Sequence, residues 1–166
     1  MSNGLKIALA CGFALLAAPQ LARAQAMSGP NMPPDQWVAD CVPRPQGKDC
    51  RVVALIDGGP DNFLGNFLIV SYSVTSRTLA VAADGMGSSA TVKIDWHPYQ
   101  TTTTCGANAC TFDPAWSGDL LQLMLAGQTL SVQASLASDS VAGPLKQSLV
   151  GFTAAYQRAQ ALQAGR

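Results

Sequence analysis

The residues in this sequence best suited to chemistry are its cysteines. Cys105 and Cys110 are separated by four residues, and Cys41 and Cys50 by eight. Cysteine pairs act in proteins as metal ligands, as redox couples or as structural disulfides. Their role here depends on their spacing, on the other ligand types present and on the compartment in which the chain folds.

The chain has five cysteines, and the spacing of these four favours structural disulfides. A zinc site needs a second pair of ligands, but the chain has a single histidine, and Cys41 and Cys50 are too far apart to form a ligand pair. A thioredoxin-like couple needs two residues between its cysteines, and neither pair has that spacing. We therefore predict no metal and no cofactor, and keep metal binding and redox catalysis as the weaker alternatives.

Of the three possible disulfide pairings, the local one agrees best with the sequence. Residues 42–49 include two prolines and a glycine, and residues 106–109 include glycine and asparagine, which are turn-forming types. A four-residue connection is a common hairpin length, and opposed residues of antiparallel strands have the spacing that a disulfide needs. We predict the disulfides Cys41–Cys50 and Cys105–Cys110.

A second candidate for chemistry is the pair Asp95 and His97. They lie two residues apart in a stretch that alternates like a strand, so both side chains could share one side as an oriented general base. A solvent-facing polar pair explains the same pattern, and no Gly-x-Ser-x-Gly motif supplies a nucleophile. We predict no catalytic residues and keep a hydrolase that uses these two residues as a less favoured alternative.

Aromatic side chains offer a third kind of site. Trp96, Tyr99 and Trp116 could contact a carbohydrate or another cell-wall ligand, with His97 beside them. Side chains of this type also fill cores and their rims. We therefore treat these four residues as candidate ligand contacts.

The start of the chain predicts export. Lys6 precedes the apolar residues 7–18, and two overlapping small-x-small cleavage sites follow. An apolar run of about a dozen residues cannot span a bilayer of about 30 Å as a helix. We predict that residues 1–26 are a signal peptide, cleaved before Gln25 or Met27. The mature protein would be periplasmic or secreted, with no membrane span.

Cleavage changes both the charge and the cysteine count. It leaves eight basic side chains against ten aspartates, a net charge of −2, and four cysteines. An even number of cysteines in an exported chain is typical of disulfides, because that compartment is oxidising. No basic patch remains to neutralise phosphates, so we predict no nucleic-acid partner.

Short strands separated by turns must position these residues. Period-two alternation of apolar and polar residues predicts strands with one buried face. The expected strands are 37–41, 50–57, 68–75, 79–83, 92–97 and 130–136. The glycine- and serine-rich residues 87–89 are predicted to form a flexible loop.

Two segments predict helices. Ser117 can cap a short helix that ends at Gly127, and Thr153 can cap a helix over 154–163. Short strands without a repeating βαβ pattern favour a mainly β fold. We predict one immunoglobulin-like β-sandwich domain over 37–166, with a short helix before the last strands and a C-terminal helix. The proline-rich residues 27–36 are predicted to be a flexible linker.

The order of several motifs resembles a known family. Trp-Val-x-x-Cys at 37–41 is followed by Cys50, then by the second cysteine pair, and the chain closes with Leu-x-Gly-Phe-x-x-Ala at 149–155. Together these motifs, over residues 37–157, resemble the invasion-associated locus B protein family of Gram-negative bacteria. The resemblance implies an exported, immunoglobulin-like β-sandwich without known catalytic residues. Some members from pathogens are linked to entry into host cells.

The sequence thus predicts a non-catalytic protein. We expect an exported, disulfide-stapled binding or structural module that interacts with a host cell or with the envelope. Its partner would be an unknown protein or an envelope component. A carbohydrate or cell-wall ligand binder is the main alternative.

Overall fold

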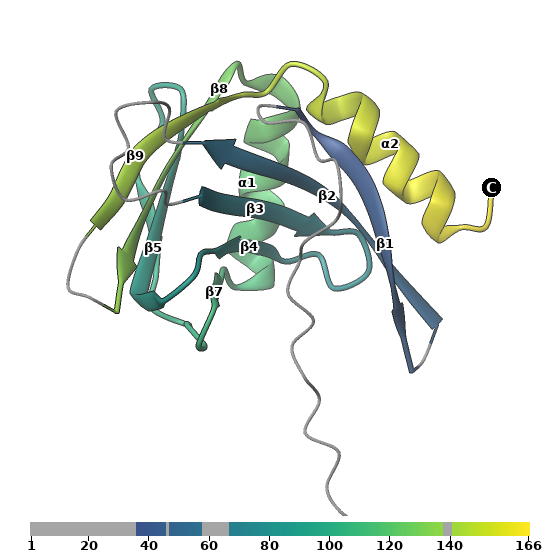
Figure 1. Cartoon of the computed structure of the whole chain (residues 1–166). Helices are drawn as coiled ribbons and strands as arrows, with labels where there is room; N and C mark the ends of the chain where they lie inside the picture. The colour runs from purple at the N-terminus through teal and green to yellow at the C-terminus, as the bar shows by residue number, and fades with distance from the viewer. Residues whose placement is uncertain (1–35, 46, 58–66, 138–140) are drawn as a thin grey trace, which may run out of the picture.

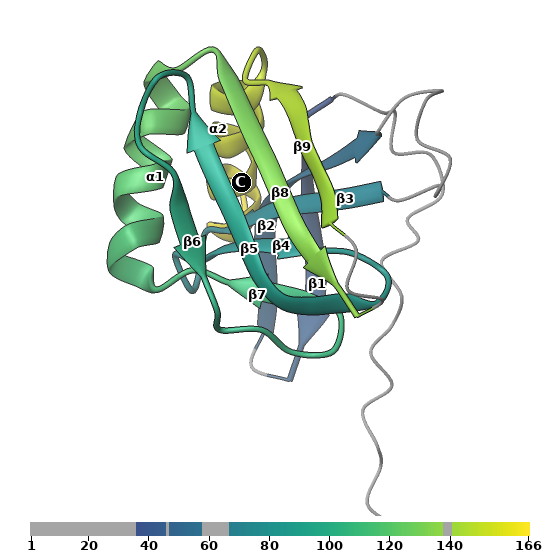
Figure 2. The ribbon, with the colours of Figure 1, turned by 90° about the vertical axis from the view of Figure 1, so that its left-hand side faces the viewer.

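The structure is a computed structural model that describes residues 36–45, 47–57, 67–137 and 141–166 (Figure 1). The predicted signal peptide and nearly all of the predicted linker lie outside these residues. The strands form two antiparallel sheets. In Figure 2 the second sheet faces the viewer, and the strands of the first sheet run across behind it.

The first sheet has the strand order β1-β2-β3-β4-β7, and the second has the order β6-β5-β8-β9. The strands of the first sheet are β1 (Val38–Arg44), β2 (Gly47–Asp57), β3 (Phe67–Ser73), β4 (Leu79–Ala82) and β7 (Ala109–Thr111). Those of the second are β5 (Met86–Ile94), β6 (Gln100–Thr102), β8 (Thr129–Leu136) and β9 (Val141–Ser148). The helices are α1 (Pro114–Ala126) and α2 (Phe152–Gln163). The predicted mainly β sandwich, with a helix before the last strands and a C-terminal helix, is confirmed.

Alternation places the core where the sequence predicts it. One face of each central strand is apolar and buried, which removes it from water and stabilises the sandwich. The buried side chains of these faces include Val52, Ala54, Ile56, Leu68, Val70, Tyr72, Val92, Ile94, Leu130, Val132 and Ala134. The strand β2 lies between β1 and β3, as its apolar residues on both faces indicate.

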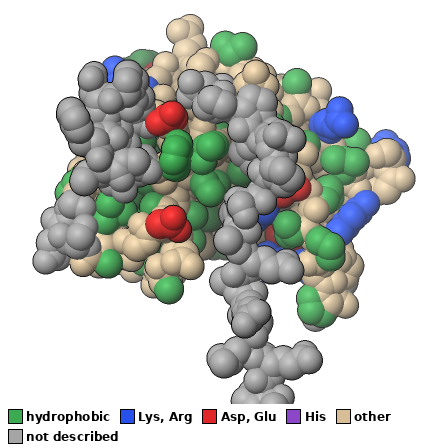
Figure 3. Space-filling model, viewed as in Figure 1, with side chains coloured by type: hydrophobic (Ala, Val, Ile, Leu, Met, Phe, Trp, Pro, Cys, Tyr) green, Lys and Arg blue, Asp and Glu red, His purple; other side chains and the backbone are tan. Residues whose placement is uncertain are grey.

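The two outer faces differ in character. Phe67 is half exposed on the outer face of the first sheet, and the neighbouring Leu55 and Ile69 are partly exposed there. Figure 3 shows hydrophobic side chains gathered over this sheet on the side turned to the viewer. Arg51 forms an ion pair with Asp40 on the same face, at 3.1 Å. The outer face of the second sheet carries mainly hydroxyl, amide and lysine side chains, with Val141 exposed at the start of β9.

The helix α1 begins earlier than predicted. Asp113 is its N-cap and accepts a hydrogen bond from the Ala115 amide at 2.9 Å, and Pro114 occupies the first helical turn. An aspartate followed by proline is a stronger start signal than a serine inside the helix, so the predicted cap at Ser117 is wrong. The Ser117 hydroxyl is buried and accepts from the Leu79 amide at 2.9 Å. The helix ends at Gly127, as predicted.

The helix α2 docks on the first sheet. Thr153 does not cap it, because the helix starts at Phe152 and Gly151 is its N-cap, with a left-handed φ of 86° that glycine adopts without strain. The Phe152 ring lies 4.9 Å from that of Trp37, edge to face. Tyr156 packs against Tyr72 at 5.9 Å, and burial raises the pKa of the Tyr72 hydroxyl. The closing segment is therefore part of the core.

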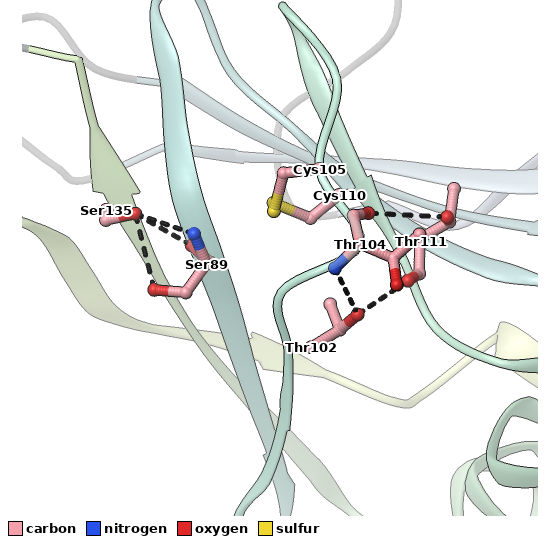
Figure 4. The surroundings of a disulfide bond; sticks show 7 residues. All are labelled: Ser89, Thr102, Thr104, Cys105, Cys110, Thr111 and Ser135. Carbon is pink, nitrogen blue, oxygen red and sulfur yellow. Dashed lines mark hydrogen bonds between the residues drawn. A yellow bond between two sulfur atoms is a disulfide. The ribbon is translucent and has the colours of Figure 1, made fainter.

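Three parts of the second sheet differ from the sequence predictions, and one of them is the short strand β6, which was not expected. Residues 87–89 belong to β5 rather than to a flexible loop, and the Ser89 amide donates to the Ser135 hydroxyl at 2.8 Å (Figure 4). The strand β9 was not predicted, because Gly143 and Pro144 interrupt its pattern. Proline is tolerated on an edge strand, and β9 is an edge of this sheet.

Both predicted disulfides are present. Cys41 and Cys50 are directly opposed in β1 and β2, and Cys105 and Cys110 are opposed in an isolated antiparallel bridge. The second turn is also held by backbone hydrogen bonds, including Thr111 N–H to the Thr104 carbonyl at 2.9 Å (Figure 4). Closing loops of this length contributes about 2–3 kcal/mol each in the chain-entropy model.

We predict that Phe152→Ala strongly lowers the urea midpoint of unfolding. Phe152 is fully buried, and truncating such a side chain costs about 3–5 kcal/mol. Gln160→Ala is the control, because Gln160 is exposed on the same helix. Equal midpoints for Phe152→Ala and the wild type would show that α2 is peripheral.

We also predict that the processed protein has no free thiol. All four cysteines of the domain are bonded in local pairs. Ellman titration of denatured, unreduced protein should detect almost none. A titre near four thiols per chain would contradict the disulfides and reopen metal binding.

Candidate functional site

Three of the four predicted contact residues lie in one turn between β5 and β6, which we call the aromatic loop (residues 95–99). The strand ends at Ile94, because Asp95 adopts a left-handed φ of 48°, a conformation that aspartate tolerates better than most residues. The His97 amide donates to the Ile94 carbonyl at 2.9 Å and closes the turn. The prediction of a strand through residue 97 is therefore wrong.

The Asp95 carboxylate anchors the aromatic loop. It accepts a hydrogen bond from the Gln128 amide at 3.0 Å and another from the Thr129 amide at 2.8 Å. The Asp95 amide donates to the Thr129 carbonyl at 2.9 Å. Hydrogen bonds to a charged group are worth about 1.5–3 kcal/mol. The loop is thus fixed to the segment that joins α1 to β8.

Glycine is required where α1 meets the aromatic loop. A side-chain carbon on Gly127 would lie 2.7 Å from Ile94 Cγ2 and 2.8 Å from the Asp95 carboxylate. Such contacts are too short for any other residue without a shift of the backbone. Gly127 therefore lets α1 end directly against the loop and brings its following amides within reach of Asp95.

Asp95 and His97 do not form the oriented base that their spacing permits. Both residues are described, and no hydrogen bond or ion pair joins their side chains; the carboxylate is occupied by backbone amides. The His97 ring instead stacks on Trp96, with ring centroids 4.1 Å apart. The arrangement orients an aromatic surface rather than a proton-transfer pair.

The aromatic loop exposes large ring surfaces. Trp96 is 81% exposed and Tyr99 is 59% exposed. The Trp96 indole stacks on His97 at an interplanar angle of 23°, which leaves its opposite face open to solvent. The Lys93 ammonium lies over the Tyr99 ring, 4.9 Å from its centroid. A ligand therefore meets an open indole, a phenol and a positive charge in one place.

Trp116, the fourth predicted contact, lies elsewhere. It is half exposed in the first turns of α1, whereas the aromatic loop is anchored just beyond the last turn of that helix. Ten helical residues correspond to about 15 Å along the axis. The structure therefore assembles Trp96, His97 and Tyr99, but does not bring Trp116 to them.

The roles of two residues that shape this site, Asp95 and Lys93, are not those that the sequence predicts. Asp95 is expected at most to orient a base, whereas an aspartate between a strand and an aromatic turn can also serve as a turn anchor. The contact of Lys93 with Tyr99 could not be predicted, because Tyr99 lies on the other side of the turn.

Among the described residues, no group of three or more potential ligands is placed to hold a metal ion. None of the described helices is both long and apolar enough to cross a membrane.

We predict effects of different size on stability for the two polar residues of the aromatic loop. Asp95→Ala leaves two amides without their acceptor and should destabilise the protein by about 1–3 kcal/mol. His97→Ala removes only the stacking contact with the exposed Trp96 and should cost no more than about 0.5 kcal/mol. Urea unfolding of both variants measures this difference. Equal stability of the Asp95 variant and the wild type would mean that the carboxylate does not hold the loop.

Comparison with known proteins supports the fold. No protein-family model and no curated protein sequence matches the chain. The crystal structure of invasion associated protein B from Bartonella henselae is similar, with a TM-score of 0.52 and 18% sequence identity. The match covers 81% of this chain and 97% of that one. The resemblance found in the sequence is thus confirmed as structural similarity: the chain has the fold of invasion associated protein B.

Proposed function

We propose that this protein is an exported, disulfide-stapled binding module without catalytic activity. It contacts its partner, a protein or a component of the cell envelope, through the aromatic loop. The observation that carries this proposal is the exposure of Trp96 and Tyr99 on a turn that is firmly anchored by Asp95.

The anchoring favours binding. Tryptophan and tyrosine are enriched among the residues that contribute most to interfaces, because they bring a large contact area with few rotatable bonds. Ordering a loop on binding costs free energy, and a loop that is already fixed avoids this cost. The Asp95 hydrogen bonds and the Trp96–His97 stack hold the rings before any partner arrives.

Export is supported by independent features. The N-terminal residues have the pattern of a signal peptide, and disulfides persist in oxidising compartments. The structural neighbour is described as invasion associated. We extend from it to this chain only a role in contacts at the envelope or with a host cell.

A hydrolase is the less favoured function. Its base would have to be His97, and the carboxylate expected to orient that residue accepts hydrogen bonds from two amides instead. A carbohydrate ligand is favoured by one specific observation, the open face of the Trp96 indole, because sugar rings pack well on flat aromatic surfaces.

We predict that Trp96→Ala lowers the apparent affinity for envelope fragments at least tenfold. Labelled protein is sedimented with isolated envelope fragments over a range of concentrations. Trp96 is exposed, so the variant should unfold at the wild-type urea midpoint. Loss of a central aromatic contact commonly costs 2 kcal/mol or more, or about thirtyfold in affinity.

Trp116→Ala is the matched control, because it removes an exposed tryptophan at the other end of α1. It should bind like the wild type. Equal losses in the two variants would point to nonspecific aromatic adhesion. If the Trp96 variant sedimented like the wild type, the aromatic loop would not be the binding site.

A further inference from the structure

We propose that the outer face of the second sheet binds an acidic polysaccharide of the uronic acid type. This inference rests on the proposed binding function and extends the aromatic loop site across the adjoining strands. The outer face is formed by Thr91, Lys93, Thr101, Ser131, Gln133 and Lys146.

The strand register places these side chains together. Val92, Ile94, Leu130 and Val132 point into the core, so their neighbours point outward. Lys93 is opposed to Ser131, and Ser131 to Lys146, so the two lysines lie in one row across three strands. Two strand spacings separate their backbones by about 10 Å. In Figure 2 this sheet faces the viewer with no helix in front of it.

The outer face carries positive charge only. The strands β5, β6, β8 and β9 contain two lysines and no acidic residue, although the mature chain has a net charge of −2. Neither lysine forms an ion pair within the described parts of the chain. Asp95, at the margin, is occupied by backbone amides. The charge on this face is therefore complementary to an anionic ligand.

The groups between the lysines suit sugar hydroxyls. Thr91 and Thr101 share a hydrogen bond at 2.9 Å, and a hydroxyl can donate and accept at the same time. Ser131 and Gln133 alternate outward along β8, where their side chains are partly exposed. Hydroxyl and amide groups on a flat sheet offer both donors and acceptors, as the hydroxyls of a sugar chain require.

The aromatic loop is continuous with this face. The Lys93 ammonium lies over the Tyr99 ring, so the row of lysines begins beside the exposed aromatic side chains. A sugar chain could pack one ring on Trp96 and extend over the hydroxyl groups toward Lys146. The loop would supply apolar contact, and the lysines would select for negative charge.

The charge density argues for a uronic acid polymer over other polyanions. Nucleic acids and heavily sulfated polymers carry dense charge and usually meet clusters of arginine and lysine. This face has no arginine and two lysines, whose backbones lie about 10 Å apart. Widely spaced point charges fit a polymer with no more than one carboxylate per sugar.

Binding to polygalacturonate tests the inference. The purified protein is run in native gels that contain polygalacturonate, neutral dextran or heparin, and the dissociation constant is derived from the retardation. We expect retardation by polygalacturonate and none by dextran. Lys93→Gln and Lys146→Gln should each weaken binding about two- to fivefold, in line with single exposed charge pairs, and the double variant about tenfold. Raising the salt concentration should abolish binding, because the screening length shortens to about 3 Å at 1 M.

Lys48→Gln is the charge-matched control, because Lys48 is exposed on the first sheet. Equal weakening by Lys48→Gln, stronger retardation by heparin, or equal retardation by dextran would overturn the inference. So would an absence of retardation by polygalacturonate. If Trp96→Ala still reduced sedimentation with envelope fragments, the proposed function would stand without the polysaccharide. If polygalacturonate binding required both lysines but not Trp96, the outer face would be confirmed as the polysaccharide site, and the aromatic loop would not be part of it.

Discussion

The sandwich depends on the contact between the first and the last segments of the domain sequence, where Trp37 meets Phe152. The second sheet contacts the first where β5 meets β7 and where β9 meets β2, and α2 packs against β1 and β2 beside these contacts. Phe152 packs against Trp37, and the Trp37 indole donates to the Ser148 carbonyl at 2.7 Å. The first and last elements of the domain thus close one core. The remaining apolar faces can stay dry only while this contact holds.

Much of this fold can be read from the sequence, because burial on one face imposes alternation. The strands β3 and β8 and the apolar β2 follow from that pattern, and opposed cysteines follow from the turns that they flank. The strand β9 could not be read, since an edge strand buries little and its Gly143 and Pro144 resemble a loop. The start of α1 is marked in the sequence by Asp113 followed by Pro114, a stronger signal than Ser117 inside the helix.

The site was predictable in its members but not in its arrangement. Trp96, His97 and Tyr99 are neighbours in the sequence, so their proximity is trivial. Their exposure is not, because it depends on the backbone of Asp95 and on amides more than thirty residues away. Trp116 is the opposite case. Its residue type suggested that it contacts the same ligand, but the length of α1 separates it from the aromatic loop. The alternation of apolar residues and the composition predict which side chains are buried, but they do not predict the residue at which a strand ends.

The two disulfides have short sequence separations, 9 and 5 residues, and each joins opposed residues on the two sides of one turn. In a chain that crosses a membrane from its N-terminus, each partner would follow the first cysteine almost immediately. Short loops also close fastest, so incorrect pairs would have little time to form. Phe152, by contrast, lies 42 residues after Cys110 and would emerge later than all four cysteines. Both cysteine pairs would then be complete in the emerged chain before the residue that closes the core, so thiol pairing does not depend on the docking of α2.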